Sequence, residues 1–167
     1  MGIQLLPTTA IFLTKNVAML SIKQFNSEQE LSKILTREEL VSFLHTHLDQ
    51  FRDTKVAINK CIDYALSAQE GKGGFILAGY FDQKLAGVVI MNRTGMEDFI
   101  PENILVYIAV DASLRGKGIG AKLMNEAIER SQGNVKLHVE YDNPAKRLYE
   151  RIGFTTKYAE MRYEKKK

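Results

Sequence analysis

The feature that most constrains this chain is a glycine-rich turn between an apolar run and an amphipathic helical pattern. Residues 104–110 are rich in β-branched and aromatic side chains, which predicts a buried strand. Gly116, Gly118 and Gly120 follow Arg115, and beyond them apolar residues recur with a helical period. A strand, such a turn and a helix N-terminus together typically bind an anion, because unpaired N–H groups point at the ligand. The sequence therefore predicts that a phosphorylated ligand binds here.

The spacing of these glycines excludes two common nucleotide motifs. A P-loop requires Lys-Ser or Lys-Thr after its last glycine, and no such pair follows Gly120. The dinucleotide fingerprint is Gly-x-Gly-x-x-Gly, whereas these three glycines alternate with other residues. What matches is Arg115-x-x-Gly118-x-Gly120, which resembles the acetyl-CoA signature Gln/Arg-x-x-Gly-x-Gly/Ala of the GNAT family of N-acetyltransferases. In that family the signature cradles the CoA pyrophosphate. A nucleotide-binding protein with the same turn is a weaker alternative.

A second segment carries the same resemblance. Residues 135–141 alternate apolar and polar, which predicts a strand. Asn143 then suits the N-cap of a helix, Pro144 its first position, and Gly153 the position just after its end. The pattern from Asn143 to Phe154 resembles the second CoA-side motif of the family, at the usual distance from the first. The resemblance covers roughly residues 19–163.

The remaining sequence predicts a single α/β (α+β) domain. Strand patterns are found at 19–25, 75–81, 84–92 and 155–163. Helical patterns are found at about 28–35, 37–51 and 55–70, with Asn26 or Ser27 as the first N-cap and a capping box at Thr36 and Glu39. Because strand 135–141 follows a helix, it should lie parallel to 104–110. The expected fold is GNAT-like: a mixed, mostly antiparallel sheet with helices on both faces and a central parallel pair, 104–110/135–141.

Charge and composition limit the classes of partner expected for this chain. The net charge of +3 equals that of the three terminal lysines, so the body is near neutral, which argues against nucleic acid as a partner. No apolar run is long enough to span a membrane, so no membrane partner is expected. The single Cys61 cannot form an intramolecular disulfide and suits a cytoplasmic location. We expect residues 1–18 to be an extension that is disordered or adds an edge segment, 19–163 the acetyltransferase domain, and 164–167 a basic tail.

The resemblance also implies where a cosubstrate, acetyl-CoA, would bind. In the family the strands equivalent to 104–110 and 135–141 diverge, and the pantetheine arm enters the gap. The residues implied for binding are Ile108, Ala109, Val110, Arg115, Gly116, Lys117, Gly118, Ile119, Gly120, Asn143 and Tyr149. No metal is implied, and two histidines at 45 and 47 do not share a helix face that could hold one.

Acetyl transfer to an amine requires two proton movements. An alkyl ammonium with a pKa of about 10.4 must lose a proton before attack, and a thiolate must be expelled. Tyr149 lies at the general-acid position of the family and would protonate the sulfur. For the base, some members carry a glutamate at the position of Ile104, which is apolar here, so that Glu102 or Glu140 is the tentative base. Tyr107 is expected to point to the same side of its strand as its neighbours two residues away.

The implied reaction is acetyl transfer from acetyl-CoA to a primary amine by direct attack on the thioester. The acceptor, a small molecule or a peptide, would bind between the first two helices, their connection and the 93–103 loop, whose acidic residues could attract an amine. The missing glutamate at Ile104 leaves an alternative open, a CoA-binding sensor or interaction module with little catalysis. Many relatives form homodimers, although no patch in this sequence marks an interface.

Overall fold

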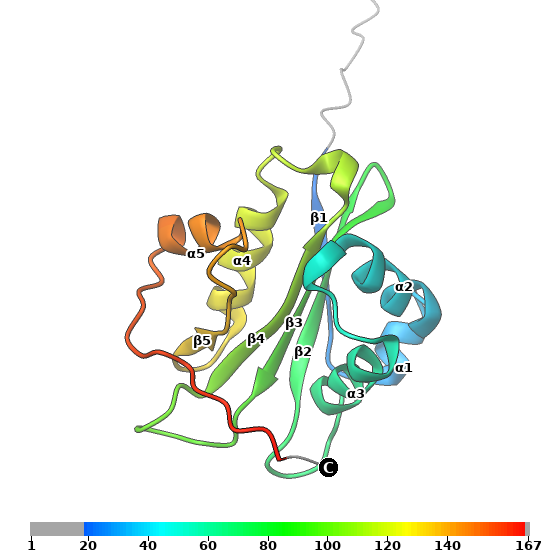
Figure 1. Cartoon of the computed structure of the whole chain (residues 1–167). Helices are drawn as coiled ribbons and strands as arrows, with labels where there is room; N and C mark the ends of the chain where they lie inside the picture. The colour runs from blue at the N-terminus through cyan, green and yellow to red at the C-terminus, as the bar shows by residue number, and fades with distance from the viewer. Residues whose placement is uncertain (1–18, 166–167) are drawn as a thin grey trace, which may run out of the picture.

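A computed structural model describes residues 19–165 and consists of a five-stranded sheet between two layers of helices (Figure 1). The strands are β1 (Ser21–Phe25), β2 (Gly74–Phe81), β3 (Lys84–Arg93), β4 (Asn103–Val110) and β5 (Val135–Leu137). The helices are α1 (Glu28–Ser32), α2 (Arg37–His47), α3 (Lys55–Ala65), α4 (Ile119–Arg130) and α5 (Lys146–Ile152), with short 3₁₀ turns η1 (Asp49–Phe51) and η2 (Ala112–Leu114). The predicted fold class is confirmed.

The sheet follows chain order, β1-β2-β3-β4-β5, and all pairs except the last are antiparallel. The predicted hairpin turn lies at Asp82 and Gln83, which both have positive φ, as the tight turns that suit twisted strands require. β5 lies parallel to β4 after the α4 crossover, as predicted, but the pair lies at the edge of the sheet rather than at its centre. Their pairing joins only residues 103–105 to 135–137, which is shorter than the predicted strand 135–141.

A β-bulge in β4 changes which way its side chains point. In the register with β3, Ile90 pairs with Tyr107 and Met91 with Leu105, so Val106 has no partner. Because of this extra residue, Leu105 packs in the core on the α4 side, whereas Tyr107 packs in the core under α1, α2 and α3. The prediction that Tyr107 points with Leu105 is therefore wrong.

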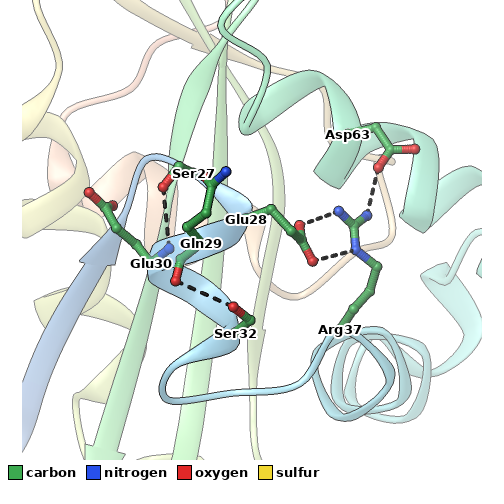
Figure 2. Close-up of polar contacts among 7 residues, drawn as sticks. All are labelled: Ser27, Glu28, Gln29, Glu30, Ser32, Arg37 and Asp63. Carbon is green, nitrogen blue, oxygen red and sulfur yellow. Dashed lines mark hydrogen bonds and ion pairs between the residues drawn. The ribbon is translucent and has the colours of Figure 1, made fainter.

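Helices α1, α2 and α3 cover one face of the sheet (Figure 1). The N-caps predicted for α1 and α2 are confirmed: Ser27 caps α1, and Thr36 forms a reciprocal capping box with Glu39 at α2. Figure 2 shows how Arg37 joins the three helices, since its guanidinium pairs with Glu28 of α1 and with Asp63 of α3, the latter at 2.7 Å. This half of the domain thus forms one packed unit.

Helix α4 lies closely on the other face because two glycines in the sheet leave room for it. A Cβ at Gly87 would lie 2.5 Å from Leu123 Cδ1, and one at Gly79 would lie 3.3 Å from Leu123 Cδ2. Leu123 is fully buried above these glycines. The close approach fixes the height of the α4 N-terminus above the end of β4.

Two further expectations differ from the structure. Helix α3 ends at Ala65 rather than near residue 70, because the chain turns back and the Gly73 N–H donates to the Tyr64 carbonyl at 3.1 Å. Residues 155–163 form no strand, and Met161 is 94% exposed. A strand needs a partner of useful length, and β5 has only three residues.

The expectation for residues 1–18 lies outside the described residues. Within the described range 19–165, none of the helices is long and apolar enough to cross a membrane.

Candidate functional site

The divergence of β4 and β5 creates the first part of the site. Pairing ends at Leu105 and Leu137, so Ile108, Ala109 and Val110 continue β4 without a partner from β5. A strand edge without a neighbour exposes N–H and C=O groups that an amide-containing ligand can bind. The predicted arm-binding residues therefore lie where such an edge is available.

The glycine turn provides the second part. Gly116 and Gly118 have φ values of 81° and 79°, a left-handed conformation that glycine adopts without strain. A Cβ on either would meet no atom of residues 19–165 within 4 Å, so these residues leave the space above the turn open. Gly118 is the N-cap of α4 and no side chain caps this helix, whereas Ser27, Thr36 and Thr54 cap α1, α2 and α3. The first N–H groups of α4 are thus left for an anion.

Gly120 has a different role from the other two glycines. It lies inside α4 with an ordinary φ, and a Cβ there would lie 3.3 Å from Leu148 Cδ2 and 3.6 Å from Val110 Cγ2. The absence of a side chain lets α4 approach both α5 and the end of β4. The third glycine of the signature therefore brings the two motifs together, and its neighbour Ile119 is buried in the core beside them.

The two cations of the turn make contacts within the protein. Arg115 Nη2 donates to the carbonyl of His47 at 2.7 Å, and its Nε donates to the carbonyl of Val110 at 3.4 Å. The Ala112 N–H donates to His47 Nδ1 at 3.2 Å. Lys117 Nζ lies 5.6 Å from the centre of the Phe81 ring. Arg115 therefore ties the turn to the end of α2, a role that the motif alone did not predict.

Helix α5 places the two residues of the second motif. The Oδ1 of Asn143 accepts from the Ala145 N–H at 2.9 Å in a turn before the helix. The N-cap of α5 is Ala145 rather than Asn143 as predicted, because the regular helix begins only at Lys146. Tyr149 is 7% exposed and packs edge-on against Phe154 with 6.0 Å between ring centres. Burial raises the pKa of Tyr149 to about 12, so its phenol keeps its proton across the neutral range. The predicted left-handed glycine, Gly153, ends the helix.

Comparison with known proteins identifies this arrangement. The model of the acetyltransferase (GNAT) domain matches residues 72–156, just over half of the chain. The chain belongs to the GNAT acetyltransferase family. No curated protein sequence matches it.

Solved structures agree with the GNAT fold. The aminoglycoside N-acetyltransferase AAC(6′)-Iy, solved with CoA, has a TM-score of 0.66 at 14% identity over 92% of this chain and 99% of its own. A GNAT family protein from Streptococcus pneumoniae TIGR4 has 0.62 at 17% identity over 89% and 100%. An aminoglycoside 6′-N-acetyltransferase from Acinetobacter haemolyticus has 0.60 at 17% over 87% and 98%. At these identities the likeness shows the fold.

Within this GNAT domain, the two tentative bases differ in their surroundings. The Glu102 carboxylate accepts from the Asn134 N–H at 2.5 Å and covers Gly133, where a Cβ would clash with it. Hydrogen bonds from its own backbone N–H and from that of Asn134 lower the pKa of Glu102. Glu140 is exposed and its backbone carbonyl accepts from the Asn143 N–H. Glu102 thus fastens the start of β4 to the loop before β5.

One acidic contact was not predicted from the sequence. Tyr107 of β4 is 8% exposed, and its hydroxyl donates to Asp53 Oδ2 at 2.6 Å. Asp53 lies in the connection between η1 and α3, far from Tyr107 along the chain. No motif marks either residue, and the bulge that turns Tyr107 towards Asp53 leaves no local sequence signal.

A cleft opens at the end of the GNAT sheet where β4 begins. Its volume is about 320 Å³, and its walls include the first residues of β4 and β5 and the loop after β3. The residues that line it are Tyr64, Asn92, Arg93, Thr94, Met96, Ile100, Ile104 and Lys136. Ile104 and Lys136 are paired across the two strands one step before they diverge. The cleft therefore adjoins the start of the gap between β4 and β5.

Proposed function

We propose that this GNAT domain transfers an acetyl group from acetyl-CoA to a primary amine of a small molecule. The observation that carries the proposal is the continuous path formed by the unpaired end of β4 and the uncapped N-terminus of α4. That path has the polar backbone groups that a pantetheine arm and a pyrophosphate require. The open space above Gly116 and Gly118 fits a phosphate group close to the backbone.

Each residue of the candidate site then has a defined role. The N–H groups from Gly116 to Gly120 would hold the pyrophosphate, and the edge at Ile108, Ala109 and Val110 would hold the arm. Acetyl-CoA supplies an activated acyl group with a thiolate leaving group. Tyr149 would donate a proton to that sulfur, since burial keeps its phenol protonated. Lys117, exposed beside the turn, would add positive charge for the phosphates.

The chemistry of the cleft indicates the class of acceptor. Its walls carry two cations, Arg93 and Lys136, and the apolar side chains of Met96, Ile100 and Ile104, with no acidic residue. Glu160 interacts electrostatically with Lys136, whereas Arg93 makes no ion pair within residues 19–165. Such walls favour an amine that carries both an anionic and an apolar group. A polycationic aminoglycoside would face two like charges there.

The test is release of free CoA thiol from acetyl-CoA with four named amines. L-phenylalanine and L-phenylalaninamide differ only in the carboxylate, and spermidine and sisomicin are polycations. We expect turnover with L-phenylalanine to exceed that with its amide, and Arg93→Gln to reduce this preference. Equal turnover of the matched pair would contradict the acceptor class. Absence of turnover with every amine would contradict the transfer itself.

A second candidate function follows from the apolar residue at the position where some relatives carry a glutamate. Ile104 lines the cleft and cannot act as a base, which favours a CoA-binding sensor with little catalysis. Tyr149→Phe distinguishes the two functions. An enzyme would lose turnover while acetyl-CoA still raised its melting temperature, because the phenyl ring preserves packing. A sensor would show acetyl-CoA binding in both proteins and turnover in neither.

A further inference from the structure

We infer that Asp53 is the general base of this acetyl transfer and that Tyr107 positions its carboxylate. The inference rests on the proposed function and assigns the one role that the resemblance leaves without a residue.

The geometry places a carboxylate beside the gap. Tyr107 lies just beyond Leu105, the last β4 residue paired with β5, so it stands where the strands have begun to diverge. The bulge turns it to the face covered by α2 and α3, and its hydroxyl donates to Asp53 Oδ2 at 2.6 Å. Asp53 itself is exposed, so it can exchange a proton with water. A buried, packed phenol thus holds an accessible carboxylate in one position.

Further polar groups lie on the same side of the sheet as this pair. Asn92 lines the cleft, is 9% exposed, and approaches Cys61 Sγ with its Nδ2 at 3.6 Å. Its Oδ1 is buried and accepts no hydrogen bond from any described residue. Cys61 and Tyr107 both pack into the core under α2 and α3. The cleft wall at Asn92 and the Tyr107–Asp53 pair therefore lie on the same face of the sheet.

The charges around Asp53 are compatible with its acting as a base. Three titratable groups from other elements interact with it: Tyr107 of β4, Cys61 of α3 and Arg162 of the C-terminal segment. Burial raises the pKa of Cys61 to about 12, so the thiol is neutral at physiological pH. Arg162 is cationic and pairs with Glu160. A carboxylate attracts an ammonium acceptor before it accepts the proton.

The proton balance of the reaction assigns one proton to Asp53. The acceptor ammonium gives a proton to the Asp53 carboxylate, which releases it to water. The neutral nitrogen then attacks the thioester carbonyl carbon, so that a C–N bond forms and the C–S bond breaks. The nitrogen loses its second proton to solvent, and the departing sulfur takes one from Tyr149, which is reprotonated by solvent. The products are an N-acetyl amide, CoA thiol and one net proton.

The test is the pH dependence of kcat/KM for Asp53→Asn, with whichever of L-phenylalanine, L-phenylalaninamide, spermidine and sisomicin the native protein acetylates fastest. At pH 7 we expect a loss of about 10²–10⁴-fold, the usual contribution of a general base. The loss should shrink as the pH approaches the pKa of the amine, since the free base then forms without help. Asp53→Glu should recover part of the activity.

Two further variants separate catalysis from structure. Asp49→Asn removes the same charge from η1, just before that connection, at a residue whose positive φ of 56° suits asparagine, and should leave kcat/KM and its pH dependence unchanged. Tyr107→Phe removes only the hydroxyl and should lower kcat while the rate keeps the pH dependence of the native protein. All four variants should keep the rise in melting temperature that acetyl-CoA gives the native protein.

The outcomes distinguish a failure of the proposed function from a failure of the assignment of Asp53 as the base. A native protein without turnover for any of the four amines would overturn the proposed function. A native protein with turnover, matched by Asp53→Asn at every pH, would overturn the assignment of the base alone. Equal losses in Asp53→Asn and Asp49→Asn would also overturn it, because they would reflect the charge of the loop.

Discussion

The conformation of Gly118 leads to a prediction that separates backbone strain from ligand binding. At φ 79° an alanine pays the penalty of the left-handed region, about 1–2 kcal/mol, and the open space around the position adds no clash. For a domain of this size that corresponds to a fall of about 2–8 °C in melting temperature. Gly118→Asn should fall by less, because asparagine tolerates this region.

The same two substitutions place a side chain over the first N–H groups of α4. In the native protein, acetyl-CoA at 100 times its Kd should add about 2.7 kcal/mol to the free energy of unfolding. We expect Gly118→Asn to lose most of that gain while remaining close to native stability without ligand. Thermal unfolding with and without acetyl-CoA measures both quantities on the same sample.

Gly71 offers a matched control for this experiment. It has nearly the same φ, 78°, and the same open space, but it lies in the turn after α3. Gly71→Asn should therefore keep the full acetyl-CoA response. If Gly118→Asn also kept it, the glycine turn would not be the ligand site. If asparagine and alanine at 118 cost the same, the conformational argument would be wrong.

Three other measurements test features of the fold and the site. Leu123→Ala removes the fully buried side chain that packs on Gly87. It should lower the free energy of unfolding, measured in urea, by about 2–5 kcal/mol. The half-buried Cys61 thiol, whose pKa burial raises to about 12, should react with a thiol reagent at pH 8 more slowly in folded than in unfolded protein, and equal rates would refute this shielding. Hydrogen bonds from its own backbone N–H and from the Asn134 N–H lower the pKa of Glu102. Its carboxylate therefore stabilises the fold above the ordinary glutamate pKa and loses that effect as the pH falls through the lowered value. Glu102→Gln should therefore lower the melting temperature at pH 7 but match native protein in strong acid, and a difference that persisted there would contradict the linkage.

Local patterns in the sequence predicted much of this architecture. The capping box at Thr36 and Glu39, the hairpin turn at Asp82 and Gln83, and the left-handed Gly153 all depend on neighbours within a few residues. Each is therefore visible in a short window. The glycine turn belongs to the same class, because its spacing alone selects one family motif over two others.

Long-range contacts could not be predicted in this way. The hydrogen bond between Tyr107 and Asp53 joins residues that are far apart in the chain, and the bulge at Val106 depends on the register with β3. The C-terminal pattern from 155 to 163 suggested a strand because alternation says nothing about whether a partner edge exists. Arg115 illustrates both local patterns and long-range contacts. Its position in the motif was evident from the sequence, whereas its contact with the carbonyl of His47 was not.

The bulge in β4 reverses the alternation of its side chains between the two faces of the sheet. Before Val106, odd-numbered side chains face α4, and after it they face α2 and α3. An alignment that treats the strand as one alternating series would compare side chains on opposite sides of the sheet. A deletion of Val106 would restore one alternating series and leave Tyr107 on the α2 and α3 face, opposite to Leu105. The half of β4 before Val106 therefore lies at the mouth of the cleft, and the half after it lies along the gap between β4 and β5. Because of the extra residue, each half can accept substitutions independently of the other.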